Sequence, residues 1–155
     1  MKDRDLLKAN LSEMAEKLNR LHRLFKQNKT CPAGWSRFSC SCYILSNRSS
    51  PWHEGREFCR NRGADLVVIE NNEEQEYLSK FTDKPFWMGL NSETGIWKWV
   101  DGSPLILTKW ATGQPDNGGG KPEYGEENCA HVKLNKYWND LSCKVYLRWL
   151  CEKLI

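Results

Sequence analysis

Long hydrophobic runs and a strong excess of one charge are both missing from this sequence. No stretch of about 20 apolar residues, the length that crosses a membrane as a helix, occurs in it, and it does not begin with a signal peptide. Lys and Arg number 23 against 20 Asp and Glu, so the formal net charge is only +3. No basic stripe is interleaved with aromatic residues, which argues against a nucleic-acid partner. Because the chain opens inside a helical pattern, we expect an ectodomain fragment; export by a signal outside the sequence is the alternative.

Patterns that catalysis or zinc binding requires are missing as well. Only three histidines occur, and none is placed with a serine in a pattern typical of a nucleophile and its base. No Cys-x-x-Cys pair with nearby histidines indicates zinc. Seven cysteines in so short a chain instead indicate an oxidising, extracellular compartment, where the three Asn-x-Ser/Thr sequons permit N-glycosylation. The sequence therefore predicts a binding domain that is not an enzyme.

Heptad spacing of apolar residues marks the N-terminal segment. Residues 5–27 are expected to form one amphipathic helix with charged residues between the apolar positions. The apolar seam consists of Leu7, Leu11, Met14, Leu18, Leu21 and Phe25. An isolated helix of this length is marginal in water, so the seam must pack on another copy or on the chain's own globular part. We favour a homo-oligomer, with residues 1–30 as a neck and residues 31–155 as a separate domain.

Helix signals come first in the globular part, and most strand signals follow. Ser50 as the cap and Pro51 in the first turn predict a helix that stops near Gly63. Asn72-Glu73-Glu74-Gln75 predicts a second helix through a capping box. Strands are expected near residues 38–44 and at 66–69, 86–90, 96–100, 130–132 and 146–150. Most of the eight tryptophans should be core residues. This order predicts the α+β class, with a long loop at residues 101–128 that is usually functional when so long.

Oxygen-bearing side chains gather around the end of that loop. Gln114-Pro115-Asp116 is followed by Glu127 and then by Trp138-Asn139-Asp140. The set combines three carboxylates with two side-chain amides and contains neither histidine nor thiol. Calcium takes about six to eight oxygen ligands, whereas zinc prefers nitrogen and sulfur. The all-oxygen donor set therefore predicts a Ca²⁺ site.

Several further motifs stand in a fixed order around this set. They are Cys31-Pro32-Ala33-Gly34-Trp35, Cys42-Tyr43, Trp52 to Cys59, Gly63-Ala64-Asp65-Leu66, Trp87-Met88-Gly89-Leu90, Trp97-Lys98-Trp99 and Asp101 to Leu105. Together they resemble the long form of the calcium-dependent (C-type) lectin domain, from Cys31 to Glu152. The resemblance implies an α+β fold with two helices, antiparallel sheets and a long calcium-binding loop, in which the ion holds a sugar directly.

Cysteine pairing is implied only by the resemblance, since the cysteine count leaves the connectivity open. It pairs Cys31 with Cys42, Cys59 with Cys151 and Cys129 with Cys143. Cys40 is left over. A buried, inert thiol is expected there; a free reactive thiol, an interchain link and a rival of Cys42 for Cys31 are the alternatives.

The resemblance also implies the ligand set and the type of sugar. Ca²⁺ would be held by Gln114, Asp116, Glu127, Asn139 and Asp140, and the first four would also bind the sugar. Pro115 is expected to be cis, as the family has it. Mannose-type members of the family carry Glu-Pro-Asn and galactose-type members carry Gln-Pro-Asp. This chain has the second form, which predicts a preference for terminal galactose or N-acetylgalactosamine.

Departures from the family pattern qualify that preference. Galactose-selective members usually place a Trp shortly after the motif, whereas Asn117-Gly118-Gly119-Gly120 follows here. Tyr124 is a candidate substitute, and packing within the loop is the alternative. His131 is similar to a histidine that lies near the 2-acetamido group in the asialoglycoprotein-receptor and macrophage galactose-lectin group; an ordinary strand histidine is the alternative. His22 and His53 are assigned to surface or packing roles, without partners.

A second ion site of many family members is expected to be lost or weak. The loop at residues 91–95 looks short, and Asn117 and Asn128 stand where acids are common in the family. Fewer charges lower the affinity for a hard cation. The resulting expectation is a single-pass type II cell-surface receptor, or else a secreted lectin, that recognises glycans on glycoproteins or microbes. Mannose, fucose or relaxed sugar specificity, or a protein ligand, are the alternative functions.

Overall fold

The computed structural model describes the backbone except at Met1, Lys29 and residues 121–124, and the side chains of residues 8–21, 30–119 and 125–155. The described elements are α1 (Lys2–Asn28), β1 (Ser36–Phe38), β2 (Ser41–Leu45), α2 (Trp52–Arg60), β3 (Asp65–Leu66), α3 (Asn72–Ser79), β4 (Phe86–Asn91), β5 (Lys98–Trp99), the 3₁₀ turn η1 (Asn117–Gly120), β6 (Cys129–Val132), β7 (Trp138–Leu141) and β8 (Arg148–Leu154).

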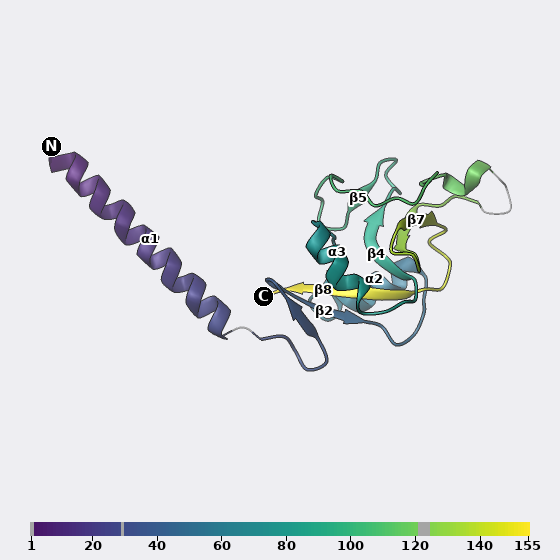
Figure 1. Ribbon diagram of the computed structural model, residues 1–155, viewed down its shortest axis with the longest axis horizontal. Coiled ribbons are helices and arrows are strands. Elements are labelled where there is room, and N and C mark those ends of the chain that lie inside the picture. The colour runs from purple at the N-terminus through teal and green to yellow at the C-terminus, as the bar shows by residue number, and fades with distance from the viewer. Residues whose placement is uncertain (1, 29, 121–124) are drawn as a thin grey trace.

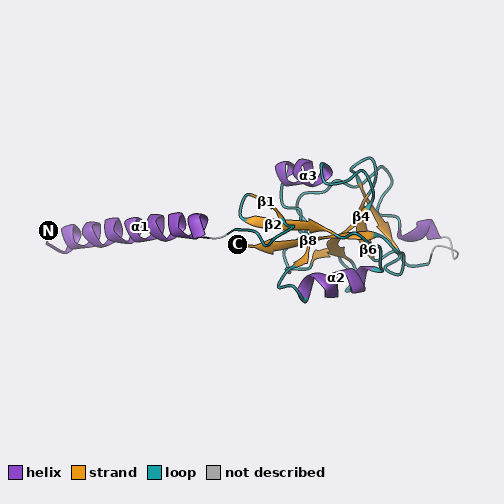
Figure 2. Ribbon diagram, turned by 90° about the horizontal axis from the view of Figure 1, so that it is seen from below, coloured by secondary structure: helices purple, strands orange, loops and turns teal. Residues whose placement is uncertain are grey.

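The described strands pair in the order β1-β2-β8-β4-β6-β7, with β3 on β8 and β5 on β4. Neighbouring strands run antiparallel, except that β4 and β8 run parallel with Trp87 opposite Trp149. Figure 2 shows α3 on one side of the sheet and α2 on the other. The predicted α+β class is therefore confirmed, with one parallel strand pair that the sequence did not predict.

Tryptophans dominate the core on both sides of the sheet, as predicted. Four are fully buried, Trp52, Trp87, Trp138 and Trp149, and Trp99 is 5% exposed. A buried indole N–H usually has a hydrogen-bond partner, although that of Trp149 has none. The indole N–H of Trp52 donates to the Met88 carbonyl at 2.8 Å, and the indole N–H of Trp138 donates to Gln75 Oε1 at 3.1 Å. These bonds join α2 and α3 to opposite faces of one sheet.

Helix α2 does not begin with the predicted serine cap. Its N-cap is Pro51, and no side chain caps it. Ser50 instead forms a β-bridge with Leu147, and its hydroxyl donates to the Pro51 carbonyl at 2.9 Å. The prediction was wrong because the sheet, rather than the helix, uses the backbone of Ser50.

Helix α3 has a capping box that lies one residue earlier than predicted. Asn71 is the N-cap, and its Oδ1 accepts the Glu74 N–H at 2.8 Å. Glu74 reaches back past the cap, and its Oε1 accepts the Glu70 N–H at 2.8 Å. Its other oxygen accepts the Tyr43 hydroxyl at 2.6 Å, so the cap also fixes α3 against β2.

Three strand predictions need correction. Only residues 65–66 of the segment around the predicted strand 66–69 form a strand, because the Val68 N–H donates to the Glu152 side chain at 3.1 Å. Of residues 96–100 only Lys98–Trp99 pairs with β4, and Ile96 is exposed. Strand β7 was missed, because Trp138-Asn139-Asp140 was interpreted as a ligand motif alone.

Disulfides join the same cysteines that the resemblance pairs: Cys31–Cys42, Cys59–Cys151 and Cys129–Cys143. The second ties α2 to β8 across 92 residues of sequence, and a bridge of this kind typically contributes about 2–4 kcal/mol. Cys40 is free and exposed. The expectation of a buried thiol is therefore wrong, because Cys40 lies in the turn between β1 and β2.

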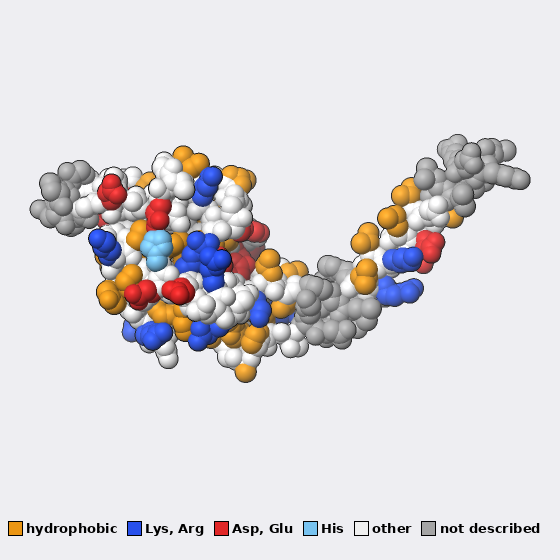
Figure 3. Space-filling view, turned by 180° about the vertical axis from the view of Figure 1, so that it is seen from behind, with side chains coloured by type: hydrophobic (Ala, Val, Ile, Leu, Met, Phe, Trp, Pro, Cys, Tyr) orange, Lys and Arg blue, Asp and Glu red, His pale blue; other side chains and the backbone are white. Residues whose placement is uncertain are grey.

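Helix α1 points away from the sheet (Figure 1). The four described seam residues, Leu11, Met14, Leu18 and Leu21, are 59%, 63%, 66% and 63% exposed, and Figure 3 shows hydrophobic side chains along one side of this helix. The side chains of Leu7 and Phe25 lie outside the described residues. Within the described chain, no helix has the length and apolar character that crossing a membrane requires. The division at residue 30 stays a prediction.

The chain enters and leaves the globular part at one end, and the long loop lies at the other. The Ile155 N–H donates to the Cys40 carbonyl at 3.0 Å, which holds the C-terminus beside the β1–β2 turn. In Figure 1 the end of α1 and the C-terminus lie at one end of the domain, and η1 lies at the other. The long loop is therefore displayed far from the point where the chain enters and leaves.

Candidate functional site

A tryptophan anchor fixes the long loop beside β7. The backbone N–H of Trp138 donates to the Lys109 carbonyl, and the backbone N–H of Ala111 donates to the Trp138 carbonyl, both at 2.8 Å. Between these bonds Trp110 packs on Trp97 and Trp138, with ring centroids 5.0 Å and 5.8 Å apart. The loop is thus attached to the sheet just before the Gln-Pro-Asp motif, opposite the strand that carries Asn139 and Asp140.

Beyond the anchor the backbone makes a left-handed turn. The Gln114–Pro115 peptide is cis, and Asn117, Gly118 and Gly119 have φ values of 50°, 81° and 63°. Glycine adopts this region freely, and asparagine tolerates it better than most residues do. The Asn-Gly-Gly-Gly sequence therefore suits the turn that follows Asp116.

Three carboxylates meet inside this turn. Oxygens of Asp116, Glu127 and Asp140 lie within 4.8 Å of one another. The Asn117 N–H donates to Asp140 at 2.7 Å, and the Gly118 N–H donates to Glu127 at 2.7 Å and to Asp116 at 3.1 Å. Successive backbone N–H groups of this kind form a concavity for negative charge. They hold the carboxylates together despite their mutual repulsion.

Two amide oxygens at the site have no hydrogen-bond partner. Among the described residues, the buried side-chain oxygens of Gln114 (Oε1) and Asn139 (Oδ1) are unpaired. A buried carbonyl-type oxygen normally has a partner, and leaving one without a partner costs about 1–3 kcal/mol. Both belong to the predicted ligand set. Their environment suits an electropositive partner such as a metal ion.

Crowding of like charge changes the pKa values at the site. Burial, a hydrogen bond to Asp116 and the charge of Asp140 raise the pKa of Glu127 to about 7. Burial and the charge of Asp116 likewise raise the pKa of Asp140. Desolvation also acts upward on Asp116, but hydrogen bonds with Glu127 and the Gly118 N–H outweigh it and lower the pKa of that carboxyl. A divalent cation would relieve this repulsion.

The residues present fit a calcium ion. The structure brings together the carboxylates of Asp116, Glu127 and Asp140, of which the last two are buried. Gln114 and Asn139 lie on the same segments of chain, and their buried side-chain oxygens lack partners. Calcium prefers oxygen donors in a flexible geometry. Whether these residues are its ligands stays a prediction, which the chemistry of the donor set supports.

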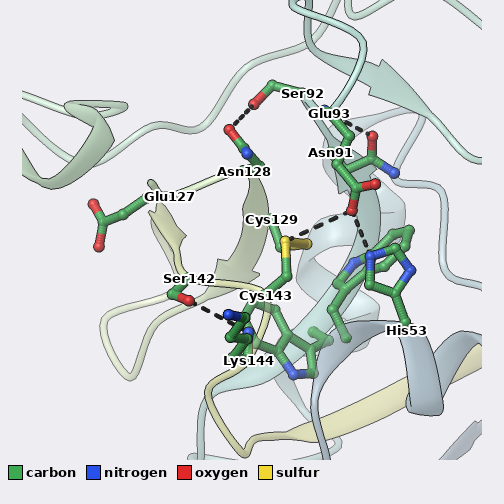
Figure 4. The surroundings of a disulfide bond; sticks show 12 residues. His53, Asn91, Ser92, Glu93, Glu127, Asn128, Cys129, Ser142, Cys143 and Lys144 are labelled. Carbon is green, nitrogen blue, oxygen red and sulfur yellow. Dashed lines mark hydrogen bonds and ion pairs between the residues drawn. A yellow bond between two sulfur atoms is a disulfide. The ribbon is translucent and has the colours of Figure 1, made fainter. Parts of the chain in front are cut away.

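Hydrogen bonds between protein groups occupy the region of the expected second ion site. The Ser92 N–H donates to the Asn128 carbonyl at 2.8 Å, and the Ser92 hydroxyl donates to Asn128 Oδ1 at 3.3 Å. Figure 4 shows this pair near the Cys129–Cys143 disulfide. Asn117 Oδ1 accepts the Glu127 N–H at 2.8 Å. Loss of the second site stays a prediction.

A second group of ligand-type residues lies beside this disulfide. His53 Nε2 and Glu93 Oε1 are 2.5 Å apart, and Glu93 also contacts Cys143 Sγ at 3.8 Å (Figure 4). Cys143 is in a disulfide and offers no thiolate to a metal. The expectation that His53 lacks a partner was wrong, because Glu93 comes from the loop after β4 and is distant in sequence.

The two candidate sugar contacts are placed differently. Tyr124 lies outside the described residues. His131 is cross-strand to Asn139, but it is only 6% exposed, and its ring meets Trp87 edge-on with centroids 6.0 Å apart. Burial, with the charge of Lys133, lowers the pKa of His131 to about 4. His131 is therefore a neutral, largely enclosed imidazole behind Asn139, and its sugar contact stays a prediction.

Comparisons with known proteins agree with the geometry. A family model described as "Lectin C-type domain" matches residues 48–153. Mouse asialoglycoprotein receptor 2 is 39% identical over 134 residues, which are 83% of this chain and 44% of that protein. The human protein of that name is 38% identical over 148 residues, 93% of this chain and 47% of that one. The chain thus spans about half the length of the curated relatives it matches.

Solved structures give the same result. The carbohydrate-recognition domain of a mouse scavenger receptor C-type lectin is 34% identical with a TM-score of 0.73, covering 80% of this chain and 96% of that one. A Kupffer cell C-type lectin receptor, described as trimeric, is 31% identical with a TM-score of 0.71, covering 95% and 96%. Both matches cover most of this chain.

Proposed function

The chain belongs to the C-type lectin domain family, and from this premise we propose that it binds terminal galactose or N-acetylgalactosamine through a calcium ion. Its relatives are carbohydrate-recognition domains and receptors rather than enzymes, so the chain is a non-enzymatic binding domain. The unpaired oxygens of Gln114 and Asn139 beside the three carboxylates are the observation that supports the site most directly.

The calcium ion would be held by Gln114, Asp116, Glu127, Asn139 and Asp140. When bound, it supplies coordination positions for two vicinal hydroxyls of a sugar. The amide groups of Gln114 and Asn139 donate hydrogen bonds to those hydroxyls, and the carboxylates of Asp116 and Glu127 accept from them. The order amide-then-acid in Gln114-Pro115-Asp116 fixes the donor and acceptor directions, and it is the basis for proposing galactose.

Relaxed sugar specificity is the second candidate, and one observation favours it. Residues 117–119 form the left-handed turn after Asp116, where galactose-selective members usually bring a tryptophan over the sugar. Neither asparagine nor glycine supplies an aromatic face. We therefore expect the diol geometry, rather than stacking, to carry the selectivity, and we keep Tyr124 and His131 as secondary contacts.

Oligomerisation through α1 would convert weak binding into useful avidity. A shallow site for one sugar binds at about millimolar affinity. The exposed heptad seam of Leu11, Met14, Leu18 and Leu21 fits self-association, and a relative that also spans the helix is described as trimeric. Several sites at matched spacing then bind a glycoprotein or microbial surface more tightly than one site can.

An extracellular location follows from the same premise. The disulfides fit an oxidising compartment, and the relatives include receptors. We propose that the domain is displayed on a cell surface as part of a single-pass type II receptor, with the neck toward the membrane; a secreted lectin is the alternative.

Retention on galactose and mannose columns, each with calcium and with excess chelator, tests the proposal. Calcium-dependent retention on galactose alone is expected. The double variant Gln114→Glu/Asp116→Asn is the matched control, and its retention should move toward mannose. Wild-type retention on both sugars would support relaxed specificity. No calcium-dependent retention by an oligomeric sample would contradict sugar binding and favour a protein ligand.

A further inference from the structure

Two asparagines tie together the segments that carry the proposed ligands. Asn117 lies in the left-handed turn after Asp116, and Asn128 directly follows Glu127. We propose that Asn117 is a positioning residue which, with the Ser92–Asn128 pair, holds the loop in its ion-binding shape through the protein's own hydrogen bonds, so that one cation per chain suffices. The proposal rests on the proposed function for the identity of the ion.

Asn117 contacts two of the three acidic residues at once. Its backbone N–H donates to Asp140 Oδ2 at 2.7 Å, and its side-chain Oδ1 accepts the Glu127 N–H at 2.8 Å. Asp140 comes from β7 and Glu127 from the end of the long loop. A single residue therefore fixes the distance between two ligand segments that the sequence places 13 positions apart.

The backbone conformation of Asn117 carries the third connection. At a φ of 50° the chain turns so that the next N–H, that of Gly118, reaches both Glu127 Oε1 and Asp116 Oδ1. Most side chains disfavour this conformation, whereas asparagine and glycine tolerate it. Asparagine is the better choice here, because only it also supplies the oxygen that the Glu127 N–H needs.

The Ser92–Asn128 pair fixes the other side of Glu127. Figure 4 shows the Glu127 carboxylate pointing away from the disulfide, while Asn128 faces Ser92. Through two hydrogen bonds this pair attaches the loop end to the segment after β4, and the Cys129–Cys143 disulfide follows at once. Glu127 is thus held at its own N–H and at its neighbour, and its carboxylate, whose Oε1 accepts the Gly118 N–H, lies with those of Asp116 and Asp140.

The hydrogen bonds of Asn117 and of the Ser92–Asn128 pair order the loop in place of a second cation. A cation orders a loop by drawing in oxygen ligands, and its affinity rises with the number of carboxylates among them. In the part of the chain that the structure describes, the one other cluster of three His, Cys, Asp or Glu residues is His53, Glu93 and Cys143, and Cys143 is in a disulfide. Neutral amides at Asn117 and Asn128 instead pair with N–H and hydroxyl groups, and such bonds form without any ion.

The test compares Asn117→Gly and Ser92→Ala with Lys136→Gly in the whole chain. Glycine accepts the φ of residue 117 and keeps its backbone N–H, so Asn117→Gly removes only the side-chain acceptor. Lys136 is the matched control, because it is also exposed and has a φ of 72°, in the β6–β7 hairpin. Amide hydrogen exchange in excess chelator reports loop order, and calorimetry with CaCl₂ reports stoichiometry and Kd.

We expect wild type to bind one calcium per chain. In chelator, Asn117→Gly should speed exchange at residues 117–118 and 127 about fivefold, and its calcium Kd should rise about fivefold, with a smaller rise for Ser92→Ala and none for Lys136→Gly. Unchanged exchange in Asn117→Gly, or two calcium ions per wild-type chain, would overturn the proposal. The exchange result does not depend on sugar binding. It therefore still tests the role of Asn117 if the protein is not retained on the galactose column.

Discussion

The sheet with α2 and α3, here called the frame, and the long loop at residues 101–128 are stabilised by opposite means. In the frame, large side chains such as Trp52 and Trp138 are fully buried and their indole N–H groups have partners, and the buried indole N–H of Trp149 is the exception among the tryptophans that the structure describes. In the loop, buried groups are acidic, and two amide oxygens are left without partners. Burial of apolar side chains stabilises the frame, whereas the clustered acids of the loop repel one another and destabilise the fold.

This difference separates the positions that determine stability from those that determine binding. A substitution in the frame should weaken the fold and leave the affinity of the folded molecules unchanged. A substitution among the clustered acids should do the reverse, because functional sites commonly keep groups that destabilise the fold. Substitutions in each region separate the two contributions.

Trp52→Ala should lower the free energy of unfolding by about 3–5 kcal/mol, because it leaves a cavity and removes the donor to the Met88 carbonyl. Urea unfolding in chelator measures the effect. Trp35→Ala is the control, since Trp35 is only partly buried at the edge of the same cluster, and it should cost less. Equal losses for the two variants would argue against a stability concentrated in the frame.

Glu127→Gln should weaken calcium binding about a hundredfold, because it removes one of three charges from a hard-cation site. In chelator at about pH 8 its stability should rise above that of wild type. The folded-state pKa of Glu127 is raised to about 7, so ionising it costs stability as pH increases through that value. Calorimetry and thermal unfolding measure the two effects; Glu126→Gln, at the exposed neighbour, should change neither. A less stable Glu127→Gln protein would break the contrast.

Glu152→Gln tests a partly buried carboxyl that belongs to the frame instead of the loop. Its oxygens accept the Ser41 hydroxyl at 2.7 Å and the Val68 N–H at 3.1 Å. Burial, with the charges of Glu74 and Glu70, raises the pKa of Glu152 to about 7. Its favourable contribution is present at low pH and is lost as pH rises through about 7, so wild type should lose about 1–2 kcal/mol more than the variant between about pH 5 and pH 8. Equal pH dependence in chelator would show that Glu152 is not responsible.

Cys40→Ser should have the smallest effect, a change of less than about 0.5 kcal/mol in the free energy of unfolding. Cys40 is free and exposed, so a thiol reagent should modify one cysteine per native wild-type chain and none in the variant. Mass spectrometry of the native protein measures this. Modification that requires unfolding would mean that the turn at Cys40 is closed in solution.

Local patterns predicted much of the frame. The apolar run at residues 86–90 became β4, and the heptad spacing became the continuous helix α1. The errors occurred where distant parts of the chain override a local signal. Ser50 was predicted to cap a helix, but the β-bridge to Leu147 uses its backbone; no local rule indicates a partner 97 residues away.

The sequence predicted the candidate ligand residues, but it did not predict the hydrogen bonds that hold them in place. Oxygen chemistry and spacing single out Gln114, Asp116 and Asn139 from the sequence. The roles of the Gly118 N–H and of Ser92 could not be found that way, because backbone donors leave no mark in a sequence and Ser92 meets Asn128 only after folding. The Asn-Gly-Gly-Gly run was the one available signal, since it indicates a left-handed turn.

The placement of both chain ends opposite the long loop has a practical consequence for measurement. A tag on Ile155, or an attachment through the helix at the other terminus, fixes the molecule by the end where the C-terminus meets the β1–β2 turn. Every immobilised copy then points its loop into the liquid (Figure 1). Sensor chips and printed arrays made this way would carry copies in one orientation, so that binding signals from different preparations can be compared directly.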